Sequence, residues 1–289
     1  MTVFTAAVVQ MRSGTDPARN IAALGELVAK AASRGATYVQ SPEMTGMVQR
    51  DREGLFAALR KPEADPVAQA ASELARRHGV HLHVGSTAVR LPDGRAANRA
   101  FLFRPDGSRA ATYDKIHMFD VDLDNGESWR ESRTYKPGEQ AVVADLDFAD
   151  GSARLGFAVC YDMRFPQLFR AEALAGAEVL TAPAAFTRQT GEAHWHVLLR
   201  ARAIENGAFV VAAAQGGVHE DGRETYGHSI VVDPWGRVLA EVDGAEPGIA
   251  VARIDTAEVA AARAKLPNLK NAREFTLAAN GRDVAEAAE

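Results

Sequence analysis

Two short turns constrain the fold of this chain more than any other feature of its sequence. Residues 92–94 and 105–107 both read Pro-Asp-Gly and stand between apolar runs, and Asp-Gly pairs in that setting indicate β-hairpins. Elsewhere, apolar runs alternate with stretches of helical periodicity that open at proline and close at glycine. This mixture predicts two mixed sheets packed face to face with helices outside, a four-layer α-β-β-α sandwich. A parallel doubly wound sheet is the alternative, with fewer such hairpins.

The expected elements follow from periodicity and turn signals. Helices are expected at residues 17–34, 66–78, 166–174, 192–205 and 256–264. Strands are expected at residues 1–10, 38–40, 81–89, 99–104, 110–114, 141–148, 153–159, 179–182, 209–214, 229–232, 238–242 and 249–254. Residues 116–140 are polar and aromatic without periodicity, which predicts a long loop, and such loops are usually functional.

The composition limits the class of protein. With 47% hydrophobic and 25% charged residues, the 289-residue chain can bury a sizeable core. A single cysteine excludes a disulfide framework and a thiolate-rich zinc site, and it suggests a reducing, cytoplasmic compartment. The net charge of -5, without a basic stripe, indicates no nucleic-acid partner, and no segment suggests a membrane partner, so a small molecule is expected. Without a linker, residues 1–289 are expected to form one domain, with a C-terminal tail from about residue 267.

The single cysteine, Cys160, stands where an apolar run gives way to a helix that starts at Pro166. A turn of this kind can present a nucleophile beside the backbone N–H groups that open a helix. A lone cysteine is nevertheless more often a small buried hydrophobic residue than a nucleophile. Further residues are therefore needed to decide between the two interpretations.

Three reactive side chains follow three expected strands, namely Glu43, Lys115 and Cys160. Strand ends can meet at one edge of a sheet, where Glu43 would accept the thiol proton while Lys115 lowers the thiol pKa and donates to an oxyanion. Taken singly, each is as well explained as a surface group. A Cys-His pair stays open because the chain has eight histidines, and His81 with His83 offers only a weak metal-binding pattern.

A weak internal repeat makes Glu43 stand out. Gly35-Ala36 and Gly176-Ala177 each follow a helix and start a short strand that reaches a proline, at Pro42 and Pro183. The next residue is Glu43 in the first copy and alanine in the second. The fold is therefore expected to contain two similar halves, and the repeat itself does not require a glutamate at this point.

Five ordered blocks of the sequence resemble the nitrilase, or carbon-nitrogen hydrolase, superfamily. They lie at residues 41–43, 113–117, 160–166, 190–195 and 226–229, so the resemblance covers nearly the whole chain. It implies the four-layer sandwich, usually paired into a homodimer, and a Glu43, Lys115 and Cys160 triad that needs no metal or organic cofactor. The resemblance also identifies Glu131 as a second glutamate that positions substrate and water.

The resemblance implies a cysteine amidase. Cys160 would attack an amide carbonyl, Lys115 and the Tyr161 N–H would hold the oxyanion, and Glu43 would pass the thiol proton to the leaving nitrogen. Ammonia would depart, and water activated by Glu43 would hydrolyse the thioester. A catalytically silent member that acts as an interaction partner is the alternative from another class, although such a protein would be expected to lose triad residues.

Four blocks of the sequence narrow the choice of substrate, because they look most like the deaminated glutathione amidase branch. They lie at residues 160–166, 196–205, 212–215 and 226–236. Omega-amidase, acting on 2-oxoglutaramate and 2-oxosuccinamate, is the nearest alternative. Both substrate types carry carboxylates, which Arg164 can hold with its planar fork, although an internal salt bridge is an equal alternative for Arg164. Thr187 is a further candidate for a substrate hydrogen bond. Glu192 and His196 depart from animal members of the branch and are expected to alter the pocket wall, and the less basic tail bears on the oligomer contacts.

Overall fold

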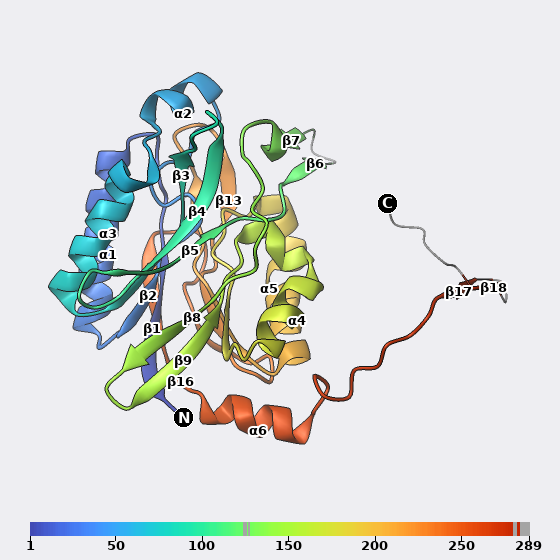
Figure 1. Ribbon diagram of the computed structural model, residues 1–289. Helices are drawn as coiled ribbons and strands as arrows, with labels where there is room; N and C mark the ends of the chain where they lie inside the picture. Colours follow the sequence, from blue (N-terminus) through green and yellow to red (C-terminus); the bar gives the residue numbers. More distant parts are fainter. Residues whose placement is uncertain (124–125, 127, 280–281, 284–289) are drawn as a thin grey trace.

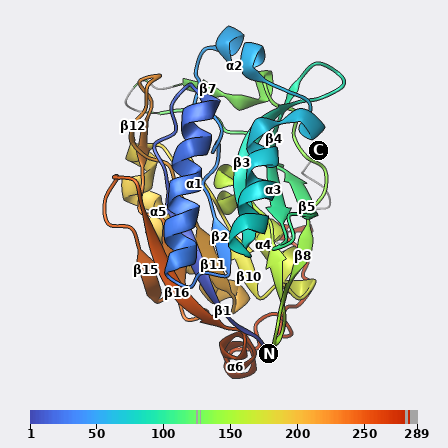
Figure 2. The same cartoon turned by 90° about the vertical axis from the view of Figure 1, so that its left-hand side faces the viewer.

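The computed structural model describes residues 1–123, 126, 128–279 and 282–283 and has four layers. Figure 1 shows helices α1 (Pro17–Ser33) and α3 (Pro66–His78) on one side, then two sheets, then α4 (Pro166–Leu174) and α5 (Arg188–Asn206) on the other. Figure 2 views the molecule from the α1 and α3 side, with both helices lying across the first sheet. This is the expected α-β-β-α sandwich, so the doubly wound alternative is wrong.

Each sheet has six strands. The first sheet has the order β16-β1-β2-β3-β4-β5 and the second has the order β15-β14-β11-β10-β9-β8. The strands of the first are β1 (Val3–Gln10), β2 (Tyr38–Gln40), β3 (His81–Arg90), β4 (Ala96–Phe103), β5 (Arg109–Asp114) and β16 (Gly248–Asp255). Those of the second are β8 (Val143–Phe148), β9 (Gly151–Gly156), β10 (Val179–Thr181), β11 (Phe209–Ala212), β14 (Ile230–Val232) and β15 (Val238–Glu241).

The two large clusters of the core lie on opposite faces of the first sheet, because successive side chains of a strand point to opposite faces. In β1, Ala6 and Val8 belong to the large cluster that fills the space between the sheets and extends under α4 and α5. Ala7 and Val9 belong to the cluster between the first sheet and helices α1 and α3. The central strands β2, β11 and β14 are accordingly buried at every residue.

The two halves predicted from the internal repeat share their local geometry. Gly35 and Gly176 both have positive φ, at 82° and 95°, and both follow a helix. In each half the next residue, Ala36 or Ala177, donates its N–H to a carbonyl five residues back, at 3.2 and 3.0 Å. Each chain segment then enters a short parallel strand, β2 or β10, that lies between two parallel neighbours.

Several expected boundaries are wrong. Residues 116–140 are not a plain loop, since β6 (Asp120–Asp122) pairs with β7 (Ser128–Arg130), and a 3₁₀ turn, η2 (Glu131–Arg133), follows. Strand β9 ends at Gly156 and not at residue 159, because the chain leaves its neighbours to form the turn η3 (Cys160–Arg164). The sequence also missed α2 (Arg52–Ala58), the turn η1 (Pro62–Ala64) and the hairpin of β12 (Gly216–Val218) and β13 (Glu224–Tyr226). These pieces are too short for periodicity to reveal them.

The C-terminal part begins with α6 (Ala257–Lys265), after which the chain runs away from the sandwich, as Figure 1 shows. It includes the two-residue strands β17 (Ala278–Ala279) and β18 (Arg282–Asp283). In the described part of the chain, no helix combines the length and the apolar character needed to cross a membrane.

Candidate active site

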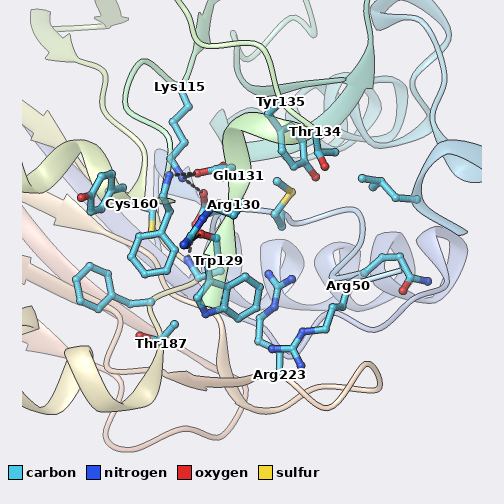
Figure 3. A pocket seen from close by; sticks show the side chains of 18 of the residues that line it. Arg50, Lys115, Trp129, Arg130, Glu131, Thr134, Tyr135, Cys160, Thr187 and Arg223 are labelled. Carbon is cyan, nitrogen blue, oxygen red and sulfur yellow. Dashed lines mark hydrogen bonds and ion pairs between the residues drawn. The ribbon is translucent and has the colours of Figure 1, made fainter. Parts of the chain in front are cut away.

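A cavity of about 350 Å³ lies at one end of the sandwich, and Glu43, Lys115, Glu131 and Cys160 all line it. These residues come from the segment after β2, the end of β5, the η2 turn and the η3 turn. The sheets therefore bring together the strand ends that the sequence singled out. Figure 3 shows the cavity with the Cys160 thiol and the Lys115 amine close to each other.

Lys115 sits between two carboxylates. Its Nζ donates to Glu43 Oε1 at 2.9 Å and to the two oxygens of Glu131 at 3.0 and 2.8 Å. Burial of the lysine opposes its charge, but attraction by Glu131 and Glu43 outweighs this and raises its pKa well above the ordinary value. The amine is therefore a fixed cation at the base of the cavity.

The Glu43 carboxylate is buried and saturated with hydrogen bonds. Besides Lys115, Asn98 Nδ2 donates to its Oε1 at 2.8 Å and the Ala185 N–H donates to its Oε2 at 2.8 Å. Burial alone would raise the pKa of Glu43, but the Lys115 charge and the hydrogen bonds from Lys115, Cys160 and the Ala185 N–H hold that pKa below its usual value. Glu43 is therefore ionised at neutral pH and able to accept a proton.

The pKa of the Cys160 thiol is set by effects that oppose one another. Lys115 does lower its pKa, but burial and the neighbouring Glu43 carboxylate outweigh that effect and raise the thiol pKa well above its ordinary value. Lys115 therefore acts on the thiol pKa in the expected direction, but burial first, and then the Glu43 carboxylate, outweigh it. The resting thiol is protonated and lies beside a carboxylate.

The backbone at Cys160 is strained. Its φ is +50°, a left-handed backbone conformation that residues other than glycine rarely adopt. The Cys160 N–H donates to the Pro183 carbonyl at 2.9 Å, which fixes the residue at the start of η3. Cys160 is only 8% exposed and still lines the cavity.

Asn98 is a site residue that the sequence analysis missed. Its Nδ2 also donates to Glu131 Oε1 at 3.2 Å, so one amide bridges the two carboxylates that hold Lys115. The backbone carbonyl of Asn98 accepts the backbone N–H of Lys115 at 3.0 Å. A buried amide in the apolar strand β4 was the available signal, because such a group needs polar partners.

Comparison with known proteins agrees with this geometry. The carbon-nitrogen hydrolase family model matches residues 5–264. The chain belongs to the carbon-nitrogen hydrolase family. It is 40% identical over 270 residues to the deaminated glutathione amidase of Yersinia enterocolitica, covering 92% of each chain.

Solved structures support the same assignment. The C. elegans NitFhit protein matches this hydrolase with a TM-score of 0.85 and 34% identity over 94% of the chain, which spans 65% of NitFhit. A glutamate mutant of the amidase from Nesterenkonia sp. AN1, with acrylamide added to its active-site cysteine, matches with a TM-score of 0.74 and 28% identity. The match covers 91% of the hydrolase and 98% of that amidase. The predicted family and the predicted sandwich are confirmed.

The other predicted site residues of the hydrolase lie around Cys160. Tyr161 and Thr187 line the cavity, and Thr187 precedes α5, with its Oγ1 2.7 Å from Thr190 Oγ1. Arg164 is not part of the lining. Its guanidinium lies over the rings of Tyr161 and Phe186, at 5.9 and 5.3 Å, and both of these residues line the cavity.

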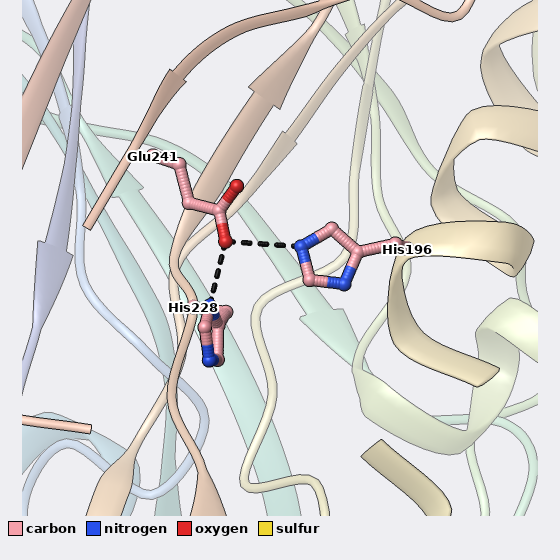
Figure 4. A group of neighbouring side chains, drawn as sticks. All are labelled: His196, His228 and Glu241. Atoms are coloured by element: carbon pink, nitrogen blue, oxygen red, sulfur yellow. Dashed lines mark hydrogen bonds and ion pairs between the residues drawn. The ribbon is translucent and has the colours of Figure 1, made fainter. Parts of the chain in front are cut away.

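The two departures from the animal branch do not alter the cavity wall, so that expectation is wrong. Glu192 pairs with Arg188 at 3.0 Å on α5, away from the cavity lining. His196 belongs to a separate cluster, shown in Figure 4, in which Glu241 Oε1 lies 3.0 Å from its Nε2 and 2.6 Å from His228 Nδ1. These three side chains have the donor types of a metal site, but the same contacts fit a carboxylate hydrogen-bonded to two imidazoles.

Proposed function

We propose that this protein is a cysteine amidase that hydrolyses the amide joining a 2-oxoglutaryl group to an amine, with deaminated glutathione as its main substrate. The observation that carries the proposal is the buried thiol beside a carboxylate and an ammonium group at the base of one cavity. The relatives' printed activity supports the substrate. The silent-member alternative has no support, since all three reactive side chains are present and in place.

The first half of the proposed reaction forms a thioester. Cys160 Sγ attacks the amide carbon while Glu43 takes the thiol proton, since the thiol is protonated and the neighbouring carboxylate is ionised before attack. The carbonyl oxygen becomes an oxyanion held by Lys115 Nζ and the Tyr161 N–H. The carbon-nitrogen bond then breaks as Glu43 returns the proton to the leaving nitrogen.

The second half regenerates the enzyme. Glu43 removes a proton from a water molecule, whose oxygen attacks the thioester carbon, and the Cys160 sulfur leaves and recovers that proton. The carboxylate product departs. Glu131 acts by holding Lys115 and by orienting substrate and water, since its oxygens already accept from Lys115 and from the Phe119 N–H at 2.7 Å.

The leaving group depends on the substrate. Ammonia, expected from the sequence, leaves from primary amides such as 2-oxoglutaramate. Deaminated glutathione contains only secondary amides, so its hydrolysis at the oxoglutaryl bond releases cysteinylglycine. Arg164 and Thr187 are the candidates for holding the 2-oxo acid part, because both adjoin the cavity on the Tyr161 side.

The proposal is tested by following 2-oxoglutarate release from deaminated glutathione and from 2-oxoglutaramate. We expect turnover of both by the wild-type protein, with the higher kcat/KM for deaminated glutathione. Cys160→Ala should abolish both activities while its thermal unfolding stays cooperative. Equal release by the wild type and Cys160→Ala, or none by the wild type, would contradict the proposal.

We further propose that the protein is a homodimer and that it is located in the cytoplasm. In this proposal residues 1–289 form one domain, with a tail from about residue 267. Apolar side chains on the outer helices support the dimer, since Val197 and Ile204 on α5 are 67% and 48% exposed and Leu174 on α4 is 63% exposed. Light scattering after size-exclusion chromatography should give twice the mass of 30.9 kDa. A monomer at micromolar concentration would contradict the dimer.

A further inference from the structure

One wall of the cavity carries two arginines that no carboxylate neutralises closely. The Arg50 guanidinium lies 4.8 Å and the Arg223 guanidinium 4.6 Å from the centre of the Trp129 ring. All three side chains line the cavity. They come from three separate segments, the stretch before α2, the hairpin of β12 and β13, and strand β7.

The guanidinium of Arg223 has few hydrogen-bond and ion-pair partners for a half-buried cation. Its side chain is 17% exposed, its Nη2 is 3.7 Å from Asp221 Oδ2, and its buried Nε has no hydrogen-bond partner within the described structure. Buried guanidinium donors normally find an acceptor. Arg223 therefore lines the cavity with no carboxylate of the described residues closer than 3.7 Å to its guanidinium.

Arg50 is also available to a ligand. It is exposed, and among the residues that the structure describes it forms no ion pair. Of the other two arginines of the lining, Arg130 pairs with Asp122 at 2.8 Å, and Arg52 lies over the Phe56 ring at 4.9 Å. Positive charge is therefore concentrated beside Trp129 in a chain whose net charge is -5.

The position of this pair relative to the nucleophile defines what it can recognise. In Figure 3, Arg50 and Arg223 lie on one side of Trp129, while Cys160 and Thr187 lie on the other. An amide attacked at Cys160 has an acyl part and a leaving part that extend in different directions. With the acyl part placed beside Tyr161 and Thr187, the leaving part extends toward the two arginines.

We propose that Arg50 and Arg223 form a second anion-binding site that holds the terminal carboxylate of a dipeptide leaving group, with Trp129 packing against the chain between. This inference rests on the proposed function and extends it to leaving-group specificity. Two extended residues reach about 7 Å, so their carboxylate needs a cation at a distance from the nucleophile. A guanidinium is well suited to it because its planar fork matches a carboxylate. A primary amide substrate has no leaving-group carboxylate and does not use this site.

The test uses three substrates with the same 2-oxoglutaryl group. They are 2-oxoglutaramate, 2-oxoglutaryl-cysteinylglycine, and the same compound with its terminal carboxylate converted to an amide. The protein variants are Arg50→Gln, Arg223→Gln and, as a matched control, Arg90→Gln. Arg90 is exposed and lies over the Phe56 ring at 5.9 Å, outside the cavity lining.

We expect Arg50→Gln and Arg223→Gln each to raise the KM for the free dipeptide substrate roughly tenfold, which is the effect of losing one charged hydrogen bond. Turnover of 2-oxoglutaramate should stay within about twofold of the wild type. For the wild type, amidation of the substrate should raise the KM by about the same factor as the substitutions do. With the amidated substrate, Arg50→Gln and Arg223→Gln should have the same KM as the wild type. Arg90→Gln should behave as the wild type.

The outcomes separate the two proposals. Failure of the wild type to hydrolyse any of the three substrates would overturn the proposed function. Hydrolysis of all three with the same KM for free and amidated dipeptide would overturn the anion site alone. The anion site would also be overturned if Arg50→Gln and Arg223→Gln lowered kcat/KM equally for 2-oxoglutaramate and for the dipeptide substrate. An equal loss would indicate a general disturbance of the cavity.

Discussion

Tyr113 Oη donates a hydrogen bond to Asp162 Oδ2 over 2.7 Å, and this contact ties the end of β5 to the turn that carries Cys160. Asp162 is fully buried and also accepts the N–H of Val159 at 2.9 Å and that of His117 at 2.9 Å. One carboxylate thus fixes the residues on both sides of the nucleophile turn. Since Lys115 follows Tyr113 by two residues, the same contact sets the ammonium relative to the thiol.

Tyr113→Phe removes this one hydrogen bond with little change of shape. We expect the free energy of unfolding to fall by about 1–3 kcal/mol, because the buried Asp162 loses a donor. We also expect kcat to fall severalfold with KM nearly unchanged, because the thiol and ammonium lose their alignment while the cavity stays intact. Urea titration and steady-state kinetics measure the two effects.

Tyr226→Phe is the control for that experiment, because it removes a phenol hydroxyl outside the cavity lining. It should leave kcat unchanged. If Tyr113→Phe retained the wild-type kcat and stability, Asp162 would not depend on Tyr113 for its position.

The sequence predicted the reactive centre better than it predicted the cavity. Glu43, Lys115 and Cys160 were found because each follows an expected strand, and sheet formation brings such strand ends together. Arg50 and Arg223 gave no signal, since each stands in a segment without periodicity and they meet only in the folded chain. The net rise of the thiol pKa gave no signal for a related reason, because burial of Cys160 and the approach of the Glu43 carboxylate depend on tertiary packing.

Gly85 is required where the two halves meet. A Cβ built on Gly85 would lie 2.2 Å from the Ser41 carbonyl oxygen and 2.4 Å from Pro183 Cβ. These atoms adjoin the segments that carry Glu43 and accept the Cys160 N–H. We expect Gly85→Ala to lose at least about 2 kcal/mol of stability and most of its activity, since backbone on both sides must move.

Gly25→Ala is the matched control for Gly85→Ala. A Cβ there meets only Leu74 Cδ2 at an ordinary 3.7 Å, and Gly25 lies within helix α1. The substitution should stabilise the protein by about 0.5–1 kcal/mol because alanine favours the helix. Thermal unfolding of both variants tests the pair, and wild-type stability of Gly85→Ala would show that the strand can shift at no cost.

The pH dependence of kcat/KM follows from the pKa directions of Glu43 and Cys160. The Glu43 pKa is lowered, so the required carboxylate is present at neutral pH and is lost only as the pH falls below the ordinary glutamate range. The thiol pKa is raised, so the protonated thiol persists through the mildly alkaline range. We therefore expect kcat/KM to be flat between about pH 6 and 9, with a fall only on the acid side.

Measurement of kcat/KM for 2-oxoglutaramate from about pH 4 to 9.5, with the substrate's own titration accounted for, tests this profile. A rise in rate with an apparent pKa between about 7 and 8.5 would indicate a thiol that ionises before attack, contrary to the raised pKa. Glu43→Gln should lower kcat by about 10²–10⁴-fold, because the thiol proton then has no acceptor.

Glu172 provides a separate test of buried charge. It lies on α4 directly beneath the nucleophile turn, is 1% exposed, and neither carboxyl oxygen has a hydrogen-bond partner in the part of the chain that the structure describes. Burial, and then the nearby Asp162 carboxylate, raise the Glu172 pKa well above its ordinary value. A group of this kind binds its proton more tightly in the folded state than in the unfolded state.

This difference in proton binding between the folded and unfolded states decides whether stability rises or falls with pH. Above the unfolded-state pKa, the folded protein holds one proton more than the unfolded chain, so stability falls as the pH rises, by at most about 1.4 kcal/mol per pH unit. Glu172→Gln removes the titrating group and should therefore gain stability relative to the wild type between about pH 5 and 8. Urea titrations across this range measure the difference, with the exposed Glu73→Gln as the control that should run parallel to the wild type. If the curves for Glu172→Gln and the wild type also ran parallel, the Glu172 carboxylate would have to find hydrogen-bond donors or water in the folded state.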